Sequence, residues 1–265
     1  MLSRLARICH CLVFKRPIGN YFLNFDQTNG SFLCSKAMSK NTTSLNVKIK
    51  VWDFPVRFFH WGLAICFVAS WASAELFDNA MQYHLYAGYA TLVLILFRVL
   101  WGFMGSTTAR FSSFIRSFAT TLKYAGTLHK PHPGQQIGHN PLGGWMVVVM
   151  LGMLFAQAGT GLFSSDDVAT QGPLAFWVGD TLSDTLSGIH QQLFNFLLAL
   201  IGLHISAVLF YRFFKHDNLI SPMITGYKDL PGGTSAPPLH FVSNGRAFLL
   251  FGLVMIGVLV PISIV

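Results

Sequence analysis

The stretch HQQLFNFLLALIGLH, residues 190–204, places a histidine at each end of a nearly unbroken apolar run. An α-helix rises about 1.5 Å and turns about 100° per residue, so we expect His204 roughly 21 Å beyond His190 and on nearly the same face. Ionisable side chains inside membrane-spanning sequence are costly, and each is therefore a candidate functional group. The stretch predicts one long helix that presents two imidazoles at two depths.

The composition predicts an integral membrane protein. Of the 265 residues, 52% are hydrophobic and only 11% are charged, whereas about 25% are charged in an ordinary soluble domain. A helix needs about 20 mostly apolar residues to span a bilayer. We therefore predict an all-α integral membrane fold, with a four-helix transmembrane bundle and a fifth, C-terminal transmembrane helix. The predicted spans are residues 56–74, 84–104, 141–163, 186–213 and 247–265.

The distribution of charge predicts the orientation of the spans. Most of the 18 Lys and Arg residues lie before the first span, between the second and third spans, and after the fourth. The loops 75–83 and 164–185 contain no Lys or Arg. Their acidic residues are Glu75, Asp78, Asp166, Asp167, Asp180 and Asp184. The positive-inside rule then places the N-terminus in the cytoplasm. This topology also accounts for the net charge of +8, so no nucleic-acid partner is inferred.

The domain organisation follows from the spans. Residues 1–47 are predicted to be a cytoplasmic N-terminal extension. Within it, residues 1–37 are expected to be irregular, and they contain no apolar run long enough to be the core of a signal peptide. A start of synthesis at Met38 is an alternative, and a mitochondrial presequence is a third. The transmembrane domain covers 48–228, a linker 229–246, and the C-terminal helix 247–265. Within the domain, residues 111–122 have the spacing of a helix lying on the membrane surface, and Asn140 and Pro141 are typical of a helix start.

Four histidines lie within the predicted spans: His60, His84, His190 and His204. Because the spans alternate in direction, His60 and His204 are expected toward the cytoplasm, and His84 and His190 toward the outside. The histidines therefore form two level pairs. Any one of them alone could instead cap a helix or bond to a neighbour, but their agreement in depth favours paired ligands.

The paired imidazoles predict haem. Two neutral imidazoles on opposite sides of one iron leave no open position for oxygen, and this arrangement favours electron transfer. Two haems b, one above the other, would connect the two sides of the bilayer. Gly188 and Gly202 each stand two residues before a histidine, where the lack of a side chain could admit a macrocycle, although small residues also serve plain helix contacts. A zinc or di-iron site would need ligands at one depth, usually with carboxylates, and the four cysteines form no haem-attachment or zinc motif.

Two arginines are candidate cofactor-binding residues. Arg98 follows His84 by fourteen residues, and Arg57 lies one turn before His60. Either side chain could pair with a propionate of the inner haem or extend to the membrane interface. The histidines of the connections are expected to be solvated, and they are His129, His132, His139 and His216. His139 could instead edge a quinone pocket.

Several motifs resemble the bacterial cytochrome b561 and Ni/Fe-hydrogenase cytochrome b family. They are VWDFPVRFFHW at 51–61, HLYAGYATLVLILFRVLWG at 84–102, GHNPLGGW at 138–145 and the two histidines of the fourth span. The resemblance covers roughly 48–228. It implies a four-helix core in the bacterial inner membrane with two haems b, ligated at the positions of His60, His84, His190 and His204. It also implies electron exchange between the quinone pool and a partner.

Three functions compete at this stage. The first is transmembrane electron transfer in a respiratory chain, between a quinone or quinol and a periplasmic c-type cytochrome or hydrogenase-like subunit. The second is an enzyme that oxidises superoxide at the outer face and reduces quinone; the outer acids Asp166 and Asp167 disfavour attraction of an anion. The third is a haem-free transporter or membrane anchor, in which the histidines relay protons or hold helices together.

Overall fold

The structure is a computed structural model of the chain, and it divides into two compact units, Met1–Leu45 and Asn46–Val265. Met38, His132, Asp166 and Asp167, which carry some of the predictions above, lie outside the described residues. The residues that the structure describes are 21–26, 31–36, 47–78, 80–130, 136–165, 170–230 and 238–264.

The first unit contains a β-hairpin. Strand β1 (Tyr21–Asp26) pairs antiparallel with β2 (Ser31–Lys36). The prediction of irregular structure is wrong for these residues, because antiparallel pairing of the two strands satisfies their backbone N–H and C=O groups.

The second unit contains the five long helices that the apolar spans predicted. Each is long and apolar enough to cross a membrane. Large apolar side chains on their outer faces, such as Ile65, Phe103 and Leu253, are more than half exposed, as expected for surfaces that meet lipid. The helices are α2 (Phe54–Glu75), α3 (Met81–Met104), α6 (Pro141–Gly161), α7 (Asp180–Phe213) and α9 (Asn244–Ile264).

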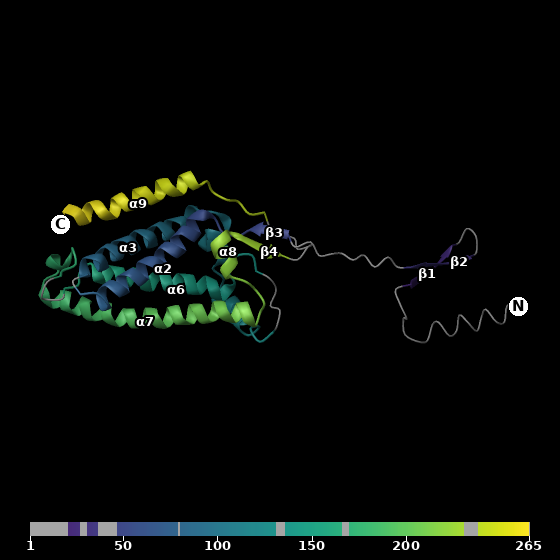
Figure 1. The fold of residues 1–265 in the computed structure, drawn as a ribbon, viewed down its shortest axis with the longest axis horizontal. Helices are drawn as coiled ribbons and strands as arrows, with labels where there is room; N and C mark the ends of the chain where they lie inside the picture. Colours follow the sequence, from purple (N-terminus) through teal and green to yellow (C-terminus); the bar gives the residue numbers. More distant parts are fainter. Residues whose placement is uncertain are drawn as a thin grey trace. The chain divides into compact units, whose positions relative to one another are not determined.

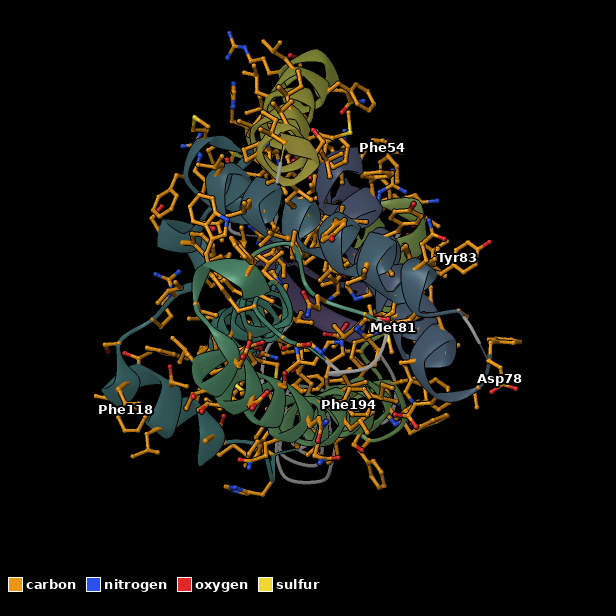
Figure 2. All side chains as sticks on the ribbon, turned by 90° about the vertical axis from the view of Figure 1, so that its left-hand side faces the viewer. Phe54, Asp78, Met81, Tyr83, Phe118 and Phe194 are labelled. Atoms are coloured by element: carbon orange, nitrogen blue, oxygen red, sulfur yellow. The ribbon has the colours of Figure 1, made fainter. Side chains whose placement is uncertain are left out.

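Helix α3 lies at the centre of this bundle (Figure 1). It packs against α2, α6 and α9, whereas α7 packs mainly against α6. The most apolar window of α3 is 50% buried, and that of α7 only 6%. Seen along the helices, α9 lies on one side of α3 and α7 on the far side of the bundle (Figure 2). Helix α7 is therefore the most loosely packed member of the four-helix core, although it carries two of the four histidines.

Polar caps set where two of these helices begin. The Asp53 carboxylate accepts a hydrogen bond from the Val56 amide at 3.0 Å, and Asn140 accepts one from the Gly143 amide at 2.7 Å. A proline follows each cap, at Pro55 and Pro141, where the missing N–H costs nothing. The predicted helix start at Asn140 and Pro141 is confirmed.

The connection between α3 and α6 is not one surface helix, so that prediction is wrong. It consists of η1 (Thr107–Ala109), α4 (Phe111–Phe114) and α5 (Phe118–Ala125). The Ser117 hydroxyl accepts a hydrogen bond from the Thr120 amide and so starts a new helix. Phe114 turns into the protein and is 4% exposed, while Phe118 is 71% exposed. The apolar residues of 111–122 therefore face two environments, the protein interior and the exposed surface.

A small polar structure closes one end of the bundle, which we call the basic end: the end where α2 and α6 begin and α3 and α7 finish. Strand β3 (Val47–Lys50) pairs antiparallel with β4 (Tyr227–Leu230), which follows α8 (Ile220–Thr225). The predicted linker thus begins after Leu230. The opposite end, which includes η2 (Ala175–Trp177), is the acidic end.

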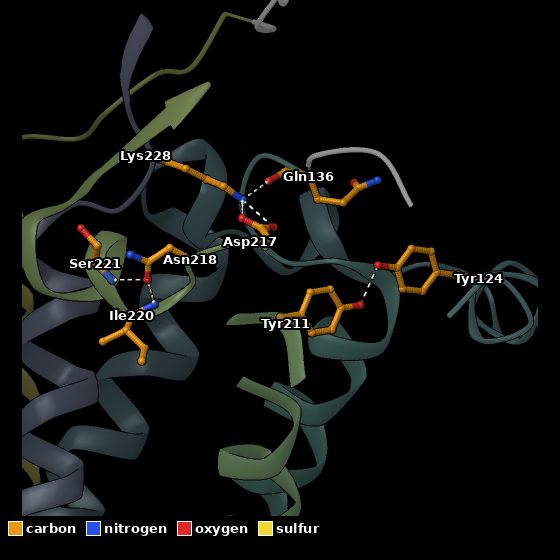
Figure 3. A network of polar contacts seen from close by, with 8 residues as sticks. All are labelled: Tyr124, Gln136, Tyr211, Asp217, Asn218, Ile220, Ser221 and Lys228. Carbon is orange, nitrogen blue, oxygen red and sulfur yellow. Dashed lines mark hydrogen bonds and ion pairs between the residues drawn. The ribbon is translucent and has the colours of Figure 1, made fainter. Parts of the chain in front are cut away.

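Hydrogen bonds tie the loops of the basic end together (Figure 3). Lys228 donates to Asp217 at 2.9 Å and to the Gln136 carbonyl at 3.2 Å. The hydroxyls of Tyr124 and Tyr211 are 2.8 Å apart. These contacts join the α3–α6 connection to the end of α7 and to β4, so the loops at this end form one packed layer.

We expect Asp53→Ala to destabilise the fold. Asp53 is 2% exposed, and besides capping α2 it accepts a hydrogen bond from the Trp101 indole of α3 at 3.1 Å. Loss of a cap costs about 0.5–2 kcal/mol, and an unsatisfied buried donor costs about 1–3 kcal/mol. Denaturant titration in detergent, followed by circular dichroism, should show the loss. The exposed Asp229→Ala is the matched control, and equal stability of the two variants would contradict the assignment.

Candidate functional site

The four predicted histidines lie in two facing pairs. His60 of α2 faces His204 of α7, with ring centroids 6.4 Å apart. His84 of α3 faces His190 of α7, with ring centroids 6.1 Å apart. We call these the first pair and the second pair. The first pair is nearer the basic end and the second nearer the acidic end, so the predicted pairing of these side chains in space agrees with the structure.

The ring separations fit a metal ion held between two imidazoles. A metal–imidazole bond is about 2 Å long and the bonded nitrogen lies about 1.2 Å from the ring centre, so two rings on opposite sides of one metal have centres about 6.4 Å apart. Both observed separations are close to this value. Among the described residues, no group of three or more His, Cys, Asp and Glu side chains could hold a metal. Two-ligand sites that leave room for a planar macrocycle fit this donor set better than a zinc site.

Backbone carbonyls orient both rings of the second pair. His84 Nδ1 lies 2.9 Å from the Ser70 carbonyl oxygen, and His190 Nδ1 lies 2.9 Å from the Gln157 carbonyl oxygen. A carbonyl only accepts, so each Nδ1 carries the proton and each Nε2 has a lone pair. Such hydrogen bonds fix the ring tautomer and raise the basicity of the ligand. The His190 Nε2 accepts a hydrogen bond from the Gln157 side-chain amide at 3.1 Å, and a metal bound there would replace this contact.

The first pair lacks this support. The Nδ1 atom of His60 is buried and has no hydrogen-bond partner. The neighbouring Trp61 indole donates instead to the Met223 carbonyl at 3.2 Å. The two pairs therefore differ in the atoms that surround equivalent ligands.

An aromatic pair lies between the same two helices. Phe67 of α2 and Phe194 of α7 stack with ring centroids 6.1 Å apart. Along α7, Phe194 lies between His190 and His204 (Figure 2 labels Phe194). The sequence analysis did not single out this pair, because phenylalanine is common throughout the spans.

Glycines leave space beside some histidines and allow contact with another. A methyl group added at Gly188 or Gly202 would meet no heavy atom within 4 Å, and Gly202 is exposed, so room for a macrocycle at these glycines stays a prediction. At Gly161 of α6 the added carbon would lie 3.0 Å from Cε1 of His190. A larger residue at this position would require the His190 ring to shift by a few tenths of an ångström.

Arg98 is buried rather than extended to the membrane interface. It is 2% exposed, and its guanidinium carbon lies 5.3 Å from the Phe111 ring centre and 6.0 Å from that of Phe114. Its Nη1 atom is buried without a hydrogen-bond partner. Burial of a charged group is costly unless the group is paired, so the unpartnered Nη1 is unfavourable in the protein alone.

Arg57 has a protein partner. Its Nη1 donates to the carbonyl of Ile224 in α8, while its Nε is buried without a partner. The guanidinium also lies 5.9 Å from the Phe54 ring centre. Arg57 therefore joins the first turn of α2 to α8.

His139 is not solvated, and that prediction is wrong. Its ring lies 4.7 Å from the Trp52 ring and 4.6 Å from the Phe114 ring, and its Nδ1 is buried without a partner. Burial, followed by the positive charge of Arg98, lowers the pKa of His139 to about 3. His139 is therefore neutral at physiological pH. Sequence reasoning missed it because its neighbours come from segments distant in the chain, whereas His129 and His216 are exposed as predicted.

These features define a helical membrane protein with two facing imidazole pairs. The chain matches the family model of prokaryotic cytochrome b561 over residues 51–226, and it belongs to that family. Members of the family are haem-binding electron-transfer proteins of the membrane, and this chain is a multi-pass bacterial membrane protein. No curated protein and no solved structure matches the chain. Helix α9 lies outside the matched residues.

We expect Gly161→Ala to weaken haem binding, because the added methyl group would push the His190 ring away from its Gln157 contact. The haem bound per polypeptide, measured from the pyridine haemochrome spectrum, should fall. Gly159→Ala is the control in the same helix, since a carbon added there meets no heavy atom within 4 Å. Equal haem content in both variants would contradict the assigned role.

Proposed function

We propose that the protein transfers electrons across the membrane through two haems b, one held by His60 and His204 and the other by His84 and His190. The observation that carries the proposal is the spacing of the facing rings, 6.4 Å in the first pair and 6.1 Å in the second. Each pair supplies two ligands from different helices, which is the donor set of a bis-histidine haem.

The residues of the chain would hold each haem and limit its chemistry. When bound, haem supplies one-electron oxidation and reduction. Two imidazoles on one iron would leave no open coordination position for oxygen. The Ser70 and Gln157 carbonyls keep the second pair in one tautomer. A site closed to oxygen in this way would favour electron transfer.

The two sites are staggered along α7. His190 and His204 are fourteen residues apart in one helix, which corresponds to roughly 21 Å along its axis. We propose that this stagger carries an electron between the two ends of the bundle, with quinone or quinol at one end and a redox protein at the other.

Arg98 is the favoured partner for a haem propionate. It is buried near the basic end with an unpartnered Nη1, and an arginine–carboxylate contact is a strong, charge-assisted hydrogen bond. Arg57 remains a weaker prediction for this role, because its Nη1 already donates to Ile224.

We infer the orientation and the partner from charge. Lys and Arg residues gather at the basic end, which supports a cytoplasmic N-terminus and an inner-membrane location. The acidic end would then face the periplasm. Its exposed carboxylates, among them Asp180 and Asp184, would suit a basic redox partner such as a c-type cytochrome or a hydrogenase-like subunit.

The two other functions have less support. Membership of a haem-binding family leaves the haem-free transporter or anchor without a basis. Superoxide oxidation with reduction of quinone stays a prediction. The acids of the acidic end disfavour it, because they would repel the superoxide anion. Stopped-flow mixing of superoxide with the oxidised protein would test it, and haem reduction there would favour this enzyme.

We expect single histidine variants to fall into two classes. His60→Ala and His204→Ala should each lose the same haem, leaving one haem per chain, and the double variant should lose no more. His84→Ala and His190→Ala should lose the other haem. The haem count and the reduced-minus-oxidised spectrum measure these losses.

The exposed His129→Ala is the control and should keep both haems. Survival of both haems in His204→Ala, with unchanged spectra, would refute the pairing. Absence of haem from the unmodified protein, despite an adequate haem supply during expression, would refute the proposed function itself.

A further inference from the structure

The region near the first pair contains buried side-chain nitrogens without hydrogen-bond partners, among them Arg98 Nη1 and His139 Nδ1. The His139 nitrogen is a donor in the tautomer that carries the proton on Nδ1. Arg98 is 2% exposed, and its Nη1 has no hydrogen-bond partner. The Nδ1 of His139 is likewise buried and unpartnered. A buried donor without an acceptor destabilises the folded state. Two such donors in one region indicate that an acceptor belongs there.

The two groups come from different elements and meet around one aromatic ring. Arg98 lies in α3, and His139 lies immediately before the Asn140 cap of α6. The Phe114 ring centre is 6.0 Å from the Arg98 guanidinium carbon and 4.6 Å from the His139 ring centre. Trp52 packs against His139 with ring centroids 4.7 Å apart. This packing holds the His139 ring against Phe114, the ring that the Arg98 guanidinium also approaches.

Arg98 and His139 lie close to the first pair of histidines. Arg98 lies in the last two turns of α3, His60 in the second turn of α2, and His139 immediately before α6. All three therefore lie at the basic end. A group bound between His60 and His204 therefore has Arg98 and His139 within its surroundings.

The nearest carboxylate does not supply the missing acceptor. Asp53 acts on Arg98 electrostatically. However, its two oxygens already accept hydrogen bonds from the Val56 amide and the Trp101 indole. The site thus offers a cation and a neutral N–H donor to a further acceptor. A carboxylate satisfies a guanidinium better than a neutral carbonyl does, because the hydrogen bond is charge-assisted.

We propose that Arg98 and His139 together bind one propionate carboxylate of the haem at the first pair, Arg98 through Nη1–H and His139 through Nδ1–H. The inference rests on the proposed function, since it requires a haem between His60 and His204. It adds His139 to the cofactor site and makes it a positioning residue for that haem. A quinone carbonyl is the competing acceptor, and the experiment below separates the two.

The experiment compares His139→Leu, which has no donor, with His139→Gln, which keeps one. His129→Leu is the control at an exposed histidine. Resonance Raman spectra of the reduced, haem-loaded proteins report the propionate bending modes, and redox titration reports the two midpoint potentials. We expect His139→Leu to shift the propionate mode and lower the potential of one haem only, because a less neutralised propionate disfavours the added electron. His139→Gln should restore both values, and the control should match the unmodified protein.

The unmodified protein supplies a measurement that needs no variant, in case His139→Leu fails to fold. In D₂O, exchange of the two N–H groups should shift the propionate mode of one haem. A protein that carries two haems but shows no shift in D₂O and none in His139→Leu would overturn this inference while leaving the proposed function intact. Unchanged haem spectra with slower reduction by quinol in His139→Leu would assign His139 to quinone instead. A protein without haem would overturn both proposals.

Discussion

The buried carboxylate of Asp53 is the contact on which the basic end depends. One oxygen caps α2 and the other holds Trp101 of α3, so a single side chain fixes two neighbouring helices against each other. His60 follows Asp53 by seven residues, and its depth is therefore set by this cap. The same carboxylate offsets part of the charge of Arg98. A cation can consequently remain inside an apolar bundle at the level of the first pair.

A bilayer restricts how such a chain can fold, and this restriction explains why much of the fold was predictable. Without water, backbone polar groups must be satisfied within each helix. Each long apolar run therefore forms one helix, and these helices are α2, α3, α6, α7 and α9. The direction of successive spans alternates, and His60 and His204 therefore meet at one level and His84 and His190 at another. Periodicity and topology were sufficient for these contacts, because each involves residues in long regular helices.

The errors lie where side chains from short segments meet. Residues 111–122 have a helical spacing, but the Ser117 cap divides them and Phe114 turns inward. His139 looked solvated because it stands in a Pro- and Gly-rich connection. Its burial depends on Trp52 and Phe114, which are far from it in sequence. Hydropathy depends on local sequence and therefore does not predict such tertiary contacts. The β1–β2 pairing was missed for a related reason, since it depends on contacts between two six-residue segments outside the apolar spans.

Helix α9 changes what the rest of the bundle presents to the membrane. Its Phe251 contacts Phe58 of α2 and Phe97 of α3, and its Ala247 is buried. One long face of the α2–α3 hairpin is therefore covered by the chain's own C-terminal segment. Any neighbouring subunit that approaches from this side meets α9 first. Lateral assembly in the bilayer is thus directed either to the outer surface of α9 or to the helices on the opposite side, where the sparsely packed α7 is exposed.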